Sequence, residues 1–220
     1  MNELDSMGKL AQETARVMSG LSGRIRNEAL RNLSEALLSR SDEIIRENAR
    51  DISSAEKKGL SDAFVDRLLL TAERIESMAS DVSNVAALPD PVGESTDMKV
   101  MPNGIQVGRR RVPIGVIGVI YESRPNITAD ISCLCIKSGN SVILRGGSDA
   151  SSSNSILSNI IRESVSECGM PVDCIQLVGD NNRELVSRML KMDRYIDLMI
   201  PRGGKDLVDM VGREATMPAI

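Results

Sequence analysis

Histidine and tryptophan are absent from this sequence of 220 residues, phenylalanine occurs once and tyrosine twice. Without histidine, the chain alone contains no Ser-His-Asp or Cys-His arrangement for nucleophilic catalysis. The four cysteines form no Cys-x-x-Cys pair, and a common zinc ligand is missing, so we expect no metal site. Few aromatic rings also leave few surfaces on which the bases of single-stranded nucleic acid stack.

Long apolar runs, an excess of positive charge and the common phosphate-binding motifs are missing as well. No stretch of 18 apolar residues occurs and residues 1–10 are polar, so we expect a cytoplasmic protein without a membrane span. A net charge of −4 and a pI near 5.1 disfavour a general nucleic-acid binder. The basic run Arg109–Arg111 is better explained as a solvated strand entrance than as a phosphate or partner site. Neither GxGxxG nor GxxxxGK[ST] is present, which disfavours the usual Rossmann dehydrogenases and P-loop NTPases.

The composition that is present, with 41% apolar and 26% charged residues, is typical of a globular protein. Residues 1–97 follow a helical rhythm, with apolar side chains three and four positions apart. The Pro102-Asn103-Gly104 turn predicts a β-hairpin in residues 98–110.

From residue 111 to residue 220, short apolar runs alternate with helical segments. Strands are predicted at 112–121, 141–145, 174–178 and 196–200, and helices at 127–138, 149–168, 181–191 and from about Gly204 onward. This alternation is typical of a doubly wound parallel sheet buried on both faces. The predicted fold is therefore α/β, a doubly wound parallel sheet with an N-terminal helical region and a β-hairpin, which the resemblance described below implies to protrude.

Glycine and arginine recur in the four loops that follow the predicted strands. Ligands of doubly wound sheets bind where these loops meet, at the carboxyl ends of the strands. Glycine lets backbone N–H groups approach a phosphate closely, and Arg145 or Arg202 can add a bidentate contact. One glycine loop is weak evidence, because glycine is ordinary in tight turns, but three at one edge favour an anionic, nucleotide-like ligand. The four loops are Tyr121–Asn126, Arg145–Asp149, Gly179–Asn181 and Pro201–Lys205.

Asn126, at the end of the first loop, allows two interpretations. Its side chain can cap the helix that follows, or its amide can donate a hydrogen bond to an oxygen that becomes negative during acyl transfer. Spacing alone favours the cap.

Several segments are similar to the γ-glutamyl phosphate reductase family, which belongs to the aldehyde dehydrogenase superfamily. The most specific is RVPIGVIGVIYESRPN at residues 111–126, and the similarity extends over the whole chain. The other segments are Asn48–Asp51, Leu60–Leu70, Ile127–Asp130, Ser138–Ala150 and Ile200–Lys205.

This resemblance implies an activity and a set of site residues. The family reduces L-glutamate 5-phosphate to L-glutamate 5-semialdehyde with NADPH, in proline biosynthesis, through a cysteine thioester. By position, Asn126 corresponds to the oxyanion-hole asparagine, which now favours that interpretation over the cap. Substrate contacts are expected from Glu122, Ser123 and Arg124. Cofactor contacts are expected from Arg145 on the adenine-side ribose and its 2′-phosphate, from Gly203 and Gly204 on the pyrophosphate, and from Gly146, Gly147, Ser148 and Gly179.

The chain departs from the family in lacking the Cys-Asn-Ala-x-Glu-Thr motif of the nucleophilic cysteine. Cys133, Cys135, Cys168 and Cys174 are expected to be core or structural thiols. We therefore expect a truncated chain, about the first half of such an enzyme, with an incomplete NADP-binding core and no catalytic cysteine domain. By itself it is expected to be inactive, and at full length to form a homo-oligomer through the hairpin.

Two other interpretations stay open. One is the reductase part of a bifunctional pyrroline-5-carboxylate synthase, although the polar start at Met1 has no kinase segment before it. The other is a catalytically dead or split nucleotide-binding or assembly module that pairs with a second polypeptide.

Overall fold

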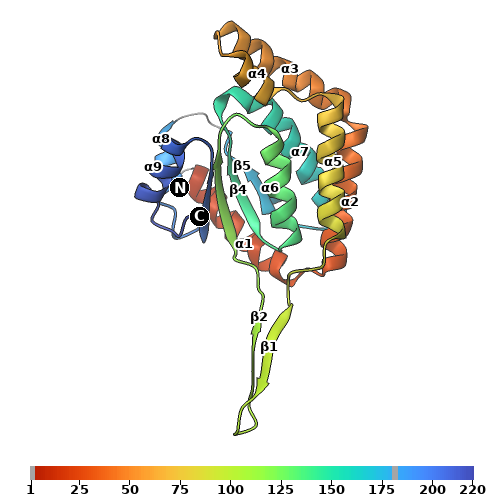
Figure 1. The fold of residues 1–220 in the computed structure, drawn as a ribbon, viewed down its shortest axis with the longest axis vertical. Helices are drawn as coiled ribbons and strands as arrows, with labels where there is room; N and C mark the ends of the chain where they lie inside the picture. The colour runs from red at the N-terminus through yellow and green to blue at the C-terminus, as the bar shows by residue number, and fades with distance from the viewer. Residues whose placement is uncertain (1–2, 180–182) are drawn as a thin grey trace.

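The computed structural model describes residues 3–179 and 183–220, with the backbone alone at Arg183. The first part of the chain is helical, as predicted, and the helices lie together on one side of the molecule apart from α1 (Figure 1). Asp180 and Asn181, which belong to the third predicted loop, lie outside the described residues. The helices of this part are α1 (Glu3–Gly20), α2 (Gly23–Ser39), α3 (Ser41–Lys57), α4 (Asp62–Leu68) and α5 (Ala72–Ala87).

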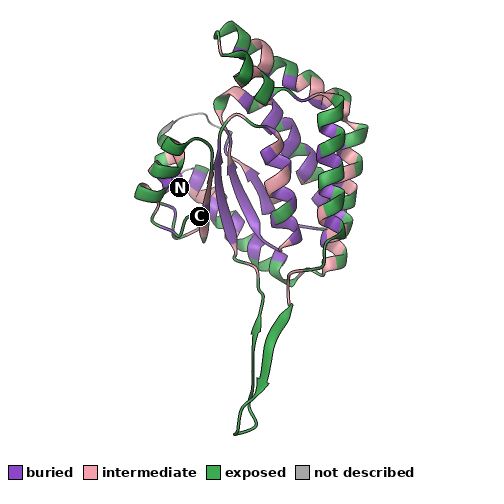
Figure 2. Cartoon of the chain, in the orientation of Figure 1, coloured by how far each residue is buried: buried purple, intermediate pink, exposed green. Residues whose placement is uncertain are grey.

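A β-hairpin projects from the body of the molecule (Figures 1 and 2). Its strands, β1 (Ser95–Val100) and β2 (Gln106–Arg110), pair antiparallel, and all their residues are exposed. The hairpin was predicted in residues 98–110 and begins three residues earlier, at Ser95, so residues 95–97 are not part of the helical region. Asp97 has a φ of 56°, and the register shifts between Thr96 and Lys99, which marks a bulge that period-2 alternation does not reveal.

The second part of the chain alternates strands and helices, which confirms the predicted doubly wound parallel sheet. Its strands pair parallel in the order β5-β4-β3-β6. Its main elements are β3 (Val116–Tyr121), α6 (Asn126–Lys137), β4 (Ser141–Arg145), α7 (Ser151–Glu167), β5 (Ile175–Leu177), α8 (Arg183–Met189), β6 (Leu198–Arg202) and α9 (Lys205–Glu214). Two short 3-10 turns, η1 (Ser148–Ala150) and η2 (Val172–Cys174), precede α7 and β5.

Helices cover both faces of this sheet (Figure 1). From β3, Ile117, Val119 and Tyr121 pack into a core shared with α2, α5, α6 and α7. Val116 and Ile120 point to the other face, into a core shared with α1, α8 and α9. Because the strands are buried on both faces, nearly all of their residues are apolar. Each fully buried aliphatic side chain stabilises the folded state by about 1.5–3 kcal/mol. No helix in the described ranges is long and apolar enough to cross a membrane.

The start of β3 differs from the prediction. The strand was predicted to begin at Val112 and begins at Val116, and Val112 and Ile114 are 72% and 53% exposed. Pro113 has no N–H to donate to a neighbouring strand, and Gly115 has a φ of 129°, outside the strand region. These four residues are apolar but form a connector between the hairpin and the sheet, in which Val112 and Ile114 are exposed and Pro113 and Gly115 are partly buried.

The boundaries of β6 also differ. This strand was predicted at 196–200 and runs from Leu198 to Arg202, so Pro201 and Arg202 lie in the sheet and not in a loop. Proline is tolerated here because Pro201, like Met199, directs its backbone nitrogen away from β3. The N–H of Met199 donates to Pro218 on that far side, whereas the carbonyl of Arg202 accepts from Glu122 on the β3 side.

Two buried polar residues of α3 hold the beginning of α7 and the end of α4. The carboxylate of Asp51 accepts hydrogen bonds from the N–H groups of Ser152 (3.1 Å) and Ser153 (2.8 Å) and from the Ser153 hydroxyl (2.7 Å). The Asn48 amide donates to the Leu68 carbonyl (2.8 Å) and to the Ser153 hydroxyl (3.0 Å), and it accepts from the N–H of Leu70 (2.8 Å). Because no side chain of α7 itself caps this helix, Asp51 supplies the missing acceptor and a favourable negative charge.

We expect Asp51→Ala to lower the free energy of unfolding by about 2–3 kcal/mol, because buried N–H groups at the start of α7 lose their acceptor. Urea unfolding followed by circular dichroism measures this change. Asp209→Ala, at an exposed position of α9, is the matched control and should stay within about 0.5 kcal/mol of the parent protein. Equal stability of the two variants would contradict the role assigned to Asp51.

Candidate functional site

The loops after β3 and β4 meet α8 and α9 at the carboxyl edge of the sheet, where they enclose a pocket of ≈ 490 Å³ that we call the cleft. This is the position at which doubly wound sheets bind ligands. The structure thus brings together most of the residues predicted in the first two loops. The predicted residues that line the cleft are Glu122, Ser123, Arg145, Gly147 and Ser148.

The two glycines after β4 allow the first two loops to approach each other. A Cβ atom on Gly146 would lie 3.0 Å from the hydroxyl of buried Tyr121, and one on Gly147 would lie 3.4 Å from the backbone nitrogen of Ser123. Arg145, between β4 and these glycines, donates from its guanidinium to the Gly146 carbonyl (3.0 Å). Gly146 is therefore required by packing, whereas Gly147 and Arg145 line the cleft itself.

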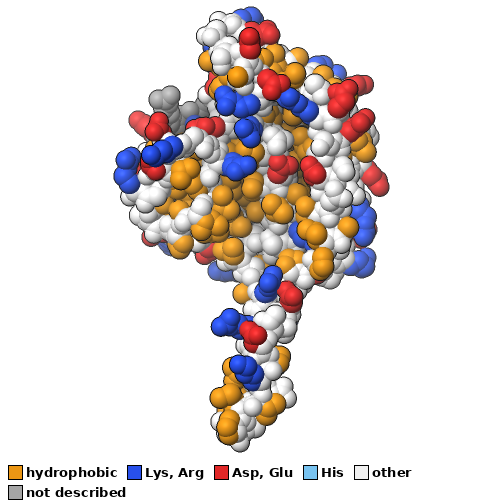
Figure 3. Space-filling view, in the orientation of Figure 1, with side chains coloured by type: hydrophobic (Ala, Val, Ile, Leu, Met, Phe, Trp, Pro, Cys, Tyr) orange, Lys and Arg blue, Asp and Glu red, His pale blue; other side chains and the backbone are white. Residues whose placement is uncertain are grey.

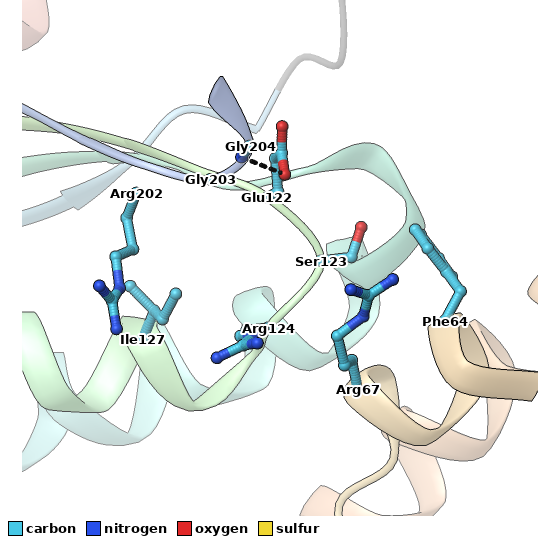
Figure 4. A pocket seen from close by; sticks show the side chains of 9 residues that line it. All are labelled: Phe64, Arg67, Glu122, Ser123, Arg124, Ile127, Arg202, Gly203 and Gly204. Atoms are coloured by element: carbon cyan, nitrogen blue, oxygen red, sulfur yellow. Dashed lines mark hydrogen bonds between the residues drawn. The ribbon is translucent and has the colours of Figure 1, made fainter. Parts of the chain in front are cut away.

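Gly203 and Gly204 form the turn between β6 and α9, and a carboxylate of the protein binds there. The N–H of Gly204 donates to Glu122 at 3.0 Å (Figure 4). A Cβ atom on Gly203 would lie 2.6 Å from the Glu122 carboxyl carbon, so glycine is needed for this close approach. The beginning of a helix favours negative charge. Glu122 was predicted to contact substrate, and here it occupies the position predicted for a pyrophosphate.

Gly179, the residue predicted from the third loop, is exposed after β5, and it does not line the cleft. A Cβ atom at Gly179 would have no neighbour within 4 Å among the described residues. The described structure therefore gives this glycine no packing role.

Asn126 is the first residue of α6 and does not cap this helix, so the capping interpretation is wrong. Its side-chain amide instead donates to the carboxylate of Asp130, one helical turn later, at 2.8 Å. Burial raises the pKa of Asp130, and the hydrogen bond from Asn126 opposes that rise. Both residues line a pocket of ≈ 330 Å³ between α4, α5 and α6, which we call the Asn126 pocket.

A third pocket, of ≈ 370 Å³, lies between the other two, and three arginines line it. Arg67 comes from α4, Arg124 from the loop after β3 and Arg202 from the end of β6 (Figure 4). We call it the arginine pocket. It shares Glu122 and Ser123 with the cleft, and Arg67 and Arg124 with the Asn126 pocket.

Sequence reasoning missed Arg67. It lies in the Leu60–Leu70 segment, for which similarity to a family was the only signal. The hydrogen bonds of Asn48 to Leu68 and Leu70 place this segment beside the sheet edge. Because these bonds join residues about 20 positions apart, no local sequence pattern reveals them.

The four cysteines form no disulfide, and Cys133, Cys135 and Cys174 are buried, as expected for core thiols. Burial raises the pKa of Cys133 and of Cys174 to about 12 and raises that of Cys135 further. Cys168 is partly buried, and its sulfur accepts a hydrogen bond from Asn32 at 3.3 Å. The described residues that line the three pockets include no cysteine.

We expect Cys168 to react with iodoacetamide more rapidly than the other three thiols at about pH 8 in the folded protein, because Cys168 is only partly buried whereas the others are covered. Burial raises the pKa of Cys168 too, so its accessibility and not its acidity sets the difference. Mass spectrometry of the intact chain should show one rapid addition, and four after denaturation. Cys168→Ser should remove the rapid addition while leaving three in the denatured state. Rapid labelling of a second thiol in the folded parent protein would contradict this interpretation.

Known proteins share both the sequence and the fold of this chain. The profile described as "Aldehyde dehydrogenase family" matches residues 1–218. The chain is 46% identical to the gamma-glutamyl phosphate reductase of Chloroflexus aggregans over 220 residues, which are 100% of this chain and 52% of that protein. It is 48% identical to that of Caldanaerobacter subterraneus over 218 residues, 99% of this chain and 53% of that protein.

A crystal structure of the gamma-glutamyl phosphate reductase of Thermotoga maritima matches the fold with a TM-score of 0.97 at 39% identity. The match covers 99% of this chain and 53% of that one. The chain thus spans about half the length of the curated relatives it matches. The family profile extends over nearly every residue, and the chain therefore belongs to the aldehyde dehydrogenase family.

Proposed function

We propose that this chain is the nucleotide-binding part of an enzyme that reduces L-glutamate 5-phosphate to L-glutamate 5-semialdehyde and phosphate with NADPH, in proline biosynthesis. Membership of the aldehyde dehydrogenase family implies a nicotinamide cofactor. The names of the relatives at 46–48% identity support the substrate. The observation that carries the proposal is the row of adjoining pockets, in which the cleft, the arginine pocket and the Asn126 pocket follow one another along the sheet edge.

The residues of the cleft fit a phosphorylated dinucleotide. Arg145 supplies a positive charge for the 2′-phosphate, and Gly147 and Ser148 offer a backbone that a ribose can approach. Gly203 and Gly204 line the adjoining arginine pocket, on its border with the cleft beside Glu122. There the N–H of Gly204 at the start of α9 is suited to a pyrophosphate oxygen, and Gly203 keeps that approach open. NADPH, when bound, supplies the hydride.

Asn126 is proposed to donate a hydrogen bond to the substrate oxygen that becomes negative. An asparagine amide has two N–H donors, and the bond to Asp130 uses one and orients the group. The other donor remains for the substrate in the Asn126 pocket. Asp130 is thus a positioning residue. The nucleophilic thiolate is proposed to come from polypeptide other than residues 1–220, because no cysteine of this chain lines the pockets and burial raises the pKa of all four thiols.

We also propose that the hairpin Ser95–Arg110 joins subunits of the full-length enzyme. Apolar side chains gather over its far half (Figure 3), and Met98, Val100, Ile105 and Val107 are all more than half exposed. Such a surface is typical of a protein–protein contact.

Calorimetric titration of the chain with NADPH tests the cofactor site. We expect saturable binding that weakens about tenfold or more in Arg145→Ala, because a charge-assisted hydrogen bond to phosphate is worth about 1.5–3 kcal/mol. NADH binding should change less, since that dinucleotide has no 2′-phosphate. Arg31→Ala, at an exposed position of α2 outside the cleft, is the control and should bind NADPH like the parent. If the folded parent protein binds no NADPH, or if Arg145→Ala binds it equally well, the assignment is wrong.

Glu122→Gln should bind NADPH about threefold more tightly than the parent, because it removes a negative charge from the start of α9. The same titration measures this gain. Asp206→Asn, which also removes a negative charge from the lining of the cleft but does not bind Gly204, is the matched control with a smaller expected effect. A weaker NADPH affinity in Glu122→Gln would show that the Glu122 contact does not compete with the cofactor.

A further inference from the structure

The arginine pocket brings together three positively charged side chains. Within the described residues, Arg67, Arg124 and Arg202 form no ion pair. All three are exposed, and on the face shown in Figure 3 basic side chains gather next to α4. Glu122, an acidic residue of this pocket, directs its carboxylate to the N–H of Gly204 and away from the guanidinium groups (Figure 4).

Each arginine is attached to a part of the backbone that other contacts hold in place. Leu68, next to Arg67, is fully buried, and its carbonyl accepts from Asn48. The Arg67 guanidinium also lies over the ring of Phe64, 5.7 Å from its centre. The backbone at Arg67 is therefore held in place before any ligand binds, and Phe64 gives its guanidinium a contact.

The other two backbone positions are fixed by the sheet edge. The N–H of Arg124 donates to the Glu122 carbonyl (2.6 Å), and the Arg124 carbonyl accepts from Ile127 at the start of α6 (3.1 Å). The Arg202 carbonyl accepts from Glu122 (3.1 Å) at the end of the β3–β6 pairing. In Figure 4, Arg124 and Arg202 extend toward the same space beside Ile127, and Arg67 points toward Ser123.

The charges of Arg67, Arg124 and Arg202 act on one pocket, so a multivalent anion bound there is attracted by all three. Guanidinium groups match phosphate oxygens in charge and in the spacing of their hydrogen-bond donors. The pocket volume of ≈ 370 Å³ admits a phosphoryl group together with the short chain that carries it. Asp130 lies in the neighbouring pocket, where burial raises its pKa and the hydrogen bond from Asn126 and, to a smaller extent, the charge of Arg202 oppose that rise.

We infer that Arg67, Arg124 and Arg202 bind the phosphate of an acyl phosphate and hold it as it leaves. This inference rests on the proposed function for the identity of the anion. In the reaction, the sulfur–carbon bond to a cysteine thiolate forms, the bond between carbon and the phosphate oxygen breaks, and its electron pair leaves on phosphate. The three positive charges stabilise that departing oxygen. The carbonyl group of the same substrate is then placed in the adjacent Asn126 pocket.

Calorimetric titration of the chain with inorganic phosphate, in a phosphate-free buffer, tests the pocket. We expect saturable binding that weakens at least about fivefold in Arg67→Ala, Arg124→Ala and Arg202→Ala, since each removes a charge-assisted contact. Arg31→Ala is the control, and Arg67→Lys should recover part of the affinity because it restores the charge. Circular dichroism confirms that each variant is folded. Parent-like phosphate affinity in the Arg67→Ala/Arg124→Ala double variant would overturn the inference.

A second titration separates the acyl phosphate from the cofactor pyrophosphate as the source of the phosphate. Repeated at saturating NADPH, the phosphate titration should still show saturable binding, weakened less than about threefold by the nearby pyrophosphate, if the pocket receives the substrate. Competition with NADPH would assign the pocket to the pyrophosphate and overturn its role in phosphate departure. Phosphate binding without any NADPH binding would contradict the proposed cofactor while leaving the pocket intact. NADPH binding without any phosphate binding would contradict the phosphate site in the arginine pocket and leave the proposed cofactor unaffected.

Discussion

The hydrogen bonds of Asn48 and Asp51 are the constraint on which the arrangement of the pockets depends. Both residues are buried on α3, one turn apart, and every contact they make reaches a different part of the chain. Asp51 holds the first turn of α7, which follows the Arg145–Asp149 loop without a connecting segment. Asn48 holds the end of α4 and the residues that follow it, through Leu68 and Leu70. A buried polar group without partners is costly, so these contacts fix both segments at once.

The parallel sheet contributes the second constraint. Because its strands run in one direction, their carboxyl ends lie at the same edge, and segments from residues 121–126, 145–149 and 202–204 come together there. The sheet cannot by itself bring α4 to that edge, since α4 precedes every strand of the sheet in the sequence. The helical region therefore contributes to the site as well as to the core, through Arg67.

The sequence was most informative where one physical effect dominated. Burial on both faces makes strands such as β3 and β4 continuous apolar runs, and the Pro102-Asn103-Gly104 turn marks the hairpin. The predicted start of β3 was wrong because apolar composition alone did not show the break at Gly115. Val112 and Ile114 precede that break, and they are apolar but exposed. Pro201 was assigned to a loop because sequence does not show that its nitrogen faces away from β3.

The candidate site divides in the same way. Arg145, Gly147 and the residues around Arg124 follow strands directly, so their meeting at the sheet edge could be predicted. The partner of Asn126 is an aspartate four positions later, which helical spacing alone could have suggested. Arg67 could not be placed, because its position depends on hydrogen bonds between α3, α4 and α7 that leave no local pattern in the sequence.

The scarcity of aromatic residues has a spectroscopic consequence. Without tryptophan, the intrinsic fluorescence of this chain comes from Tyr121 and Tyr195. Tyr121 is buried in the wall of the cleft, with its hydroxyl 2.6 Å from that of Thr128, and burial raises its pKa to about 12. Its ring lies against Gly146, and Tyr195 packs against Gly8 on α1. Tyrosine emission is therefore an intrinsic optical probe of the cleft, with a single other fluorophore as background.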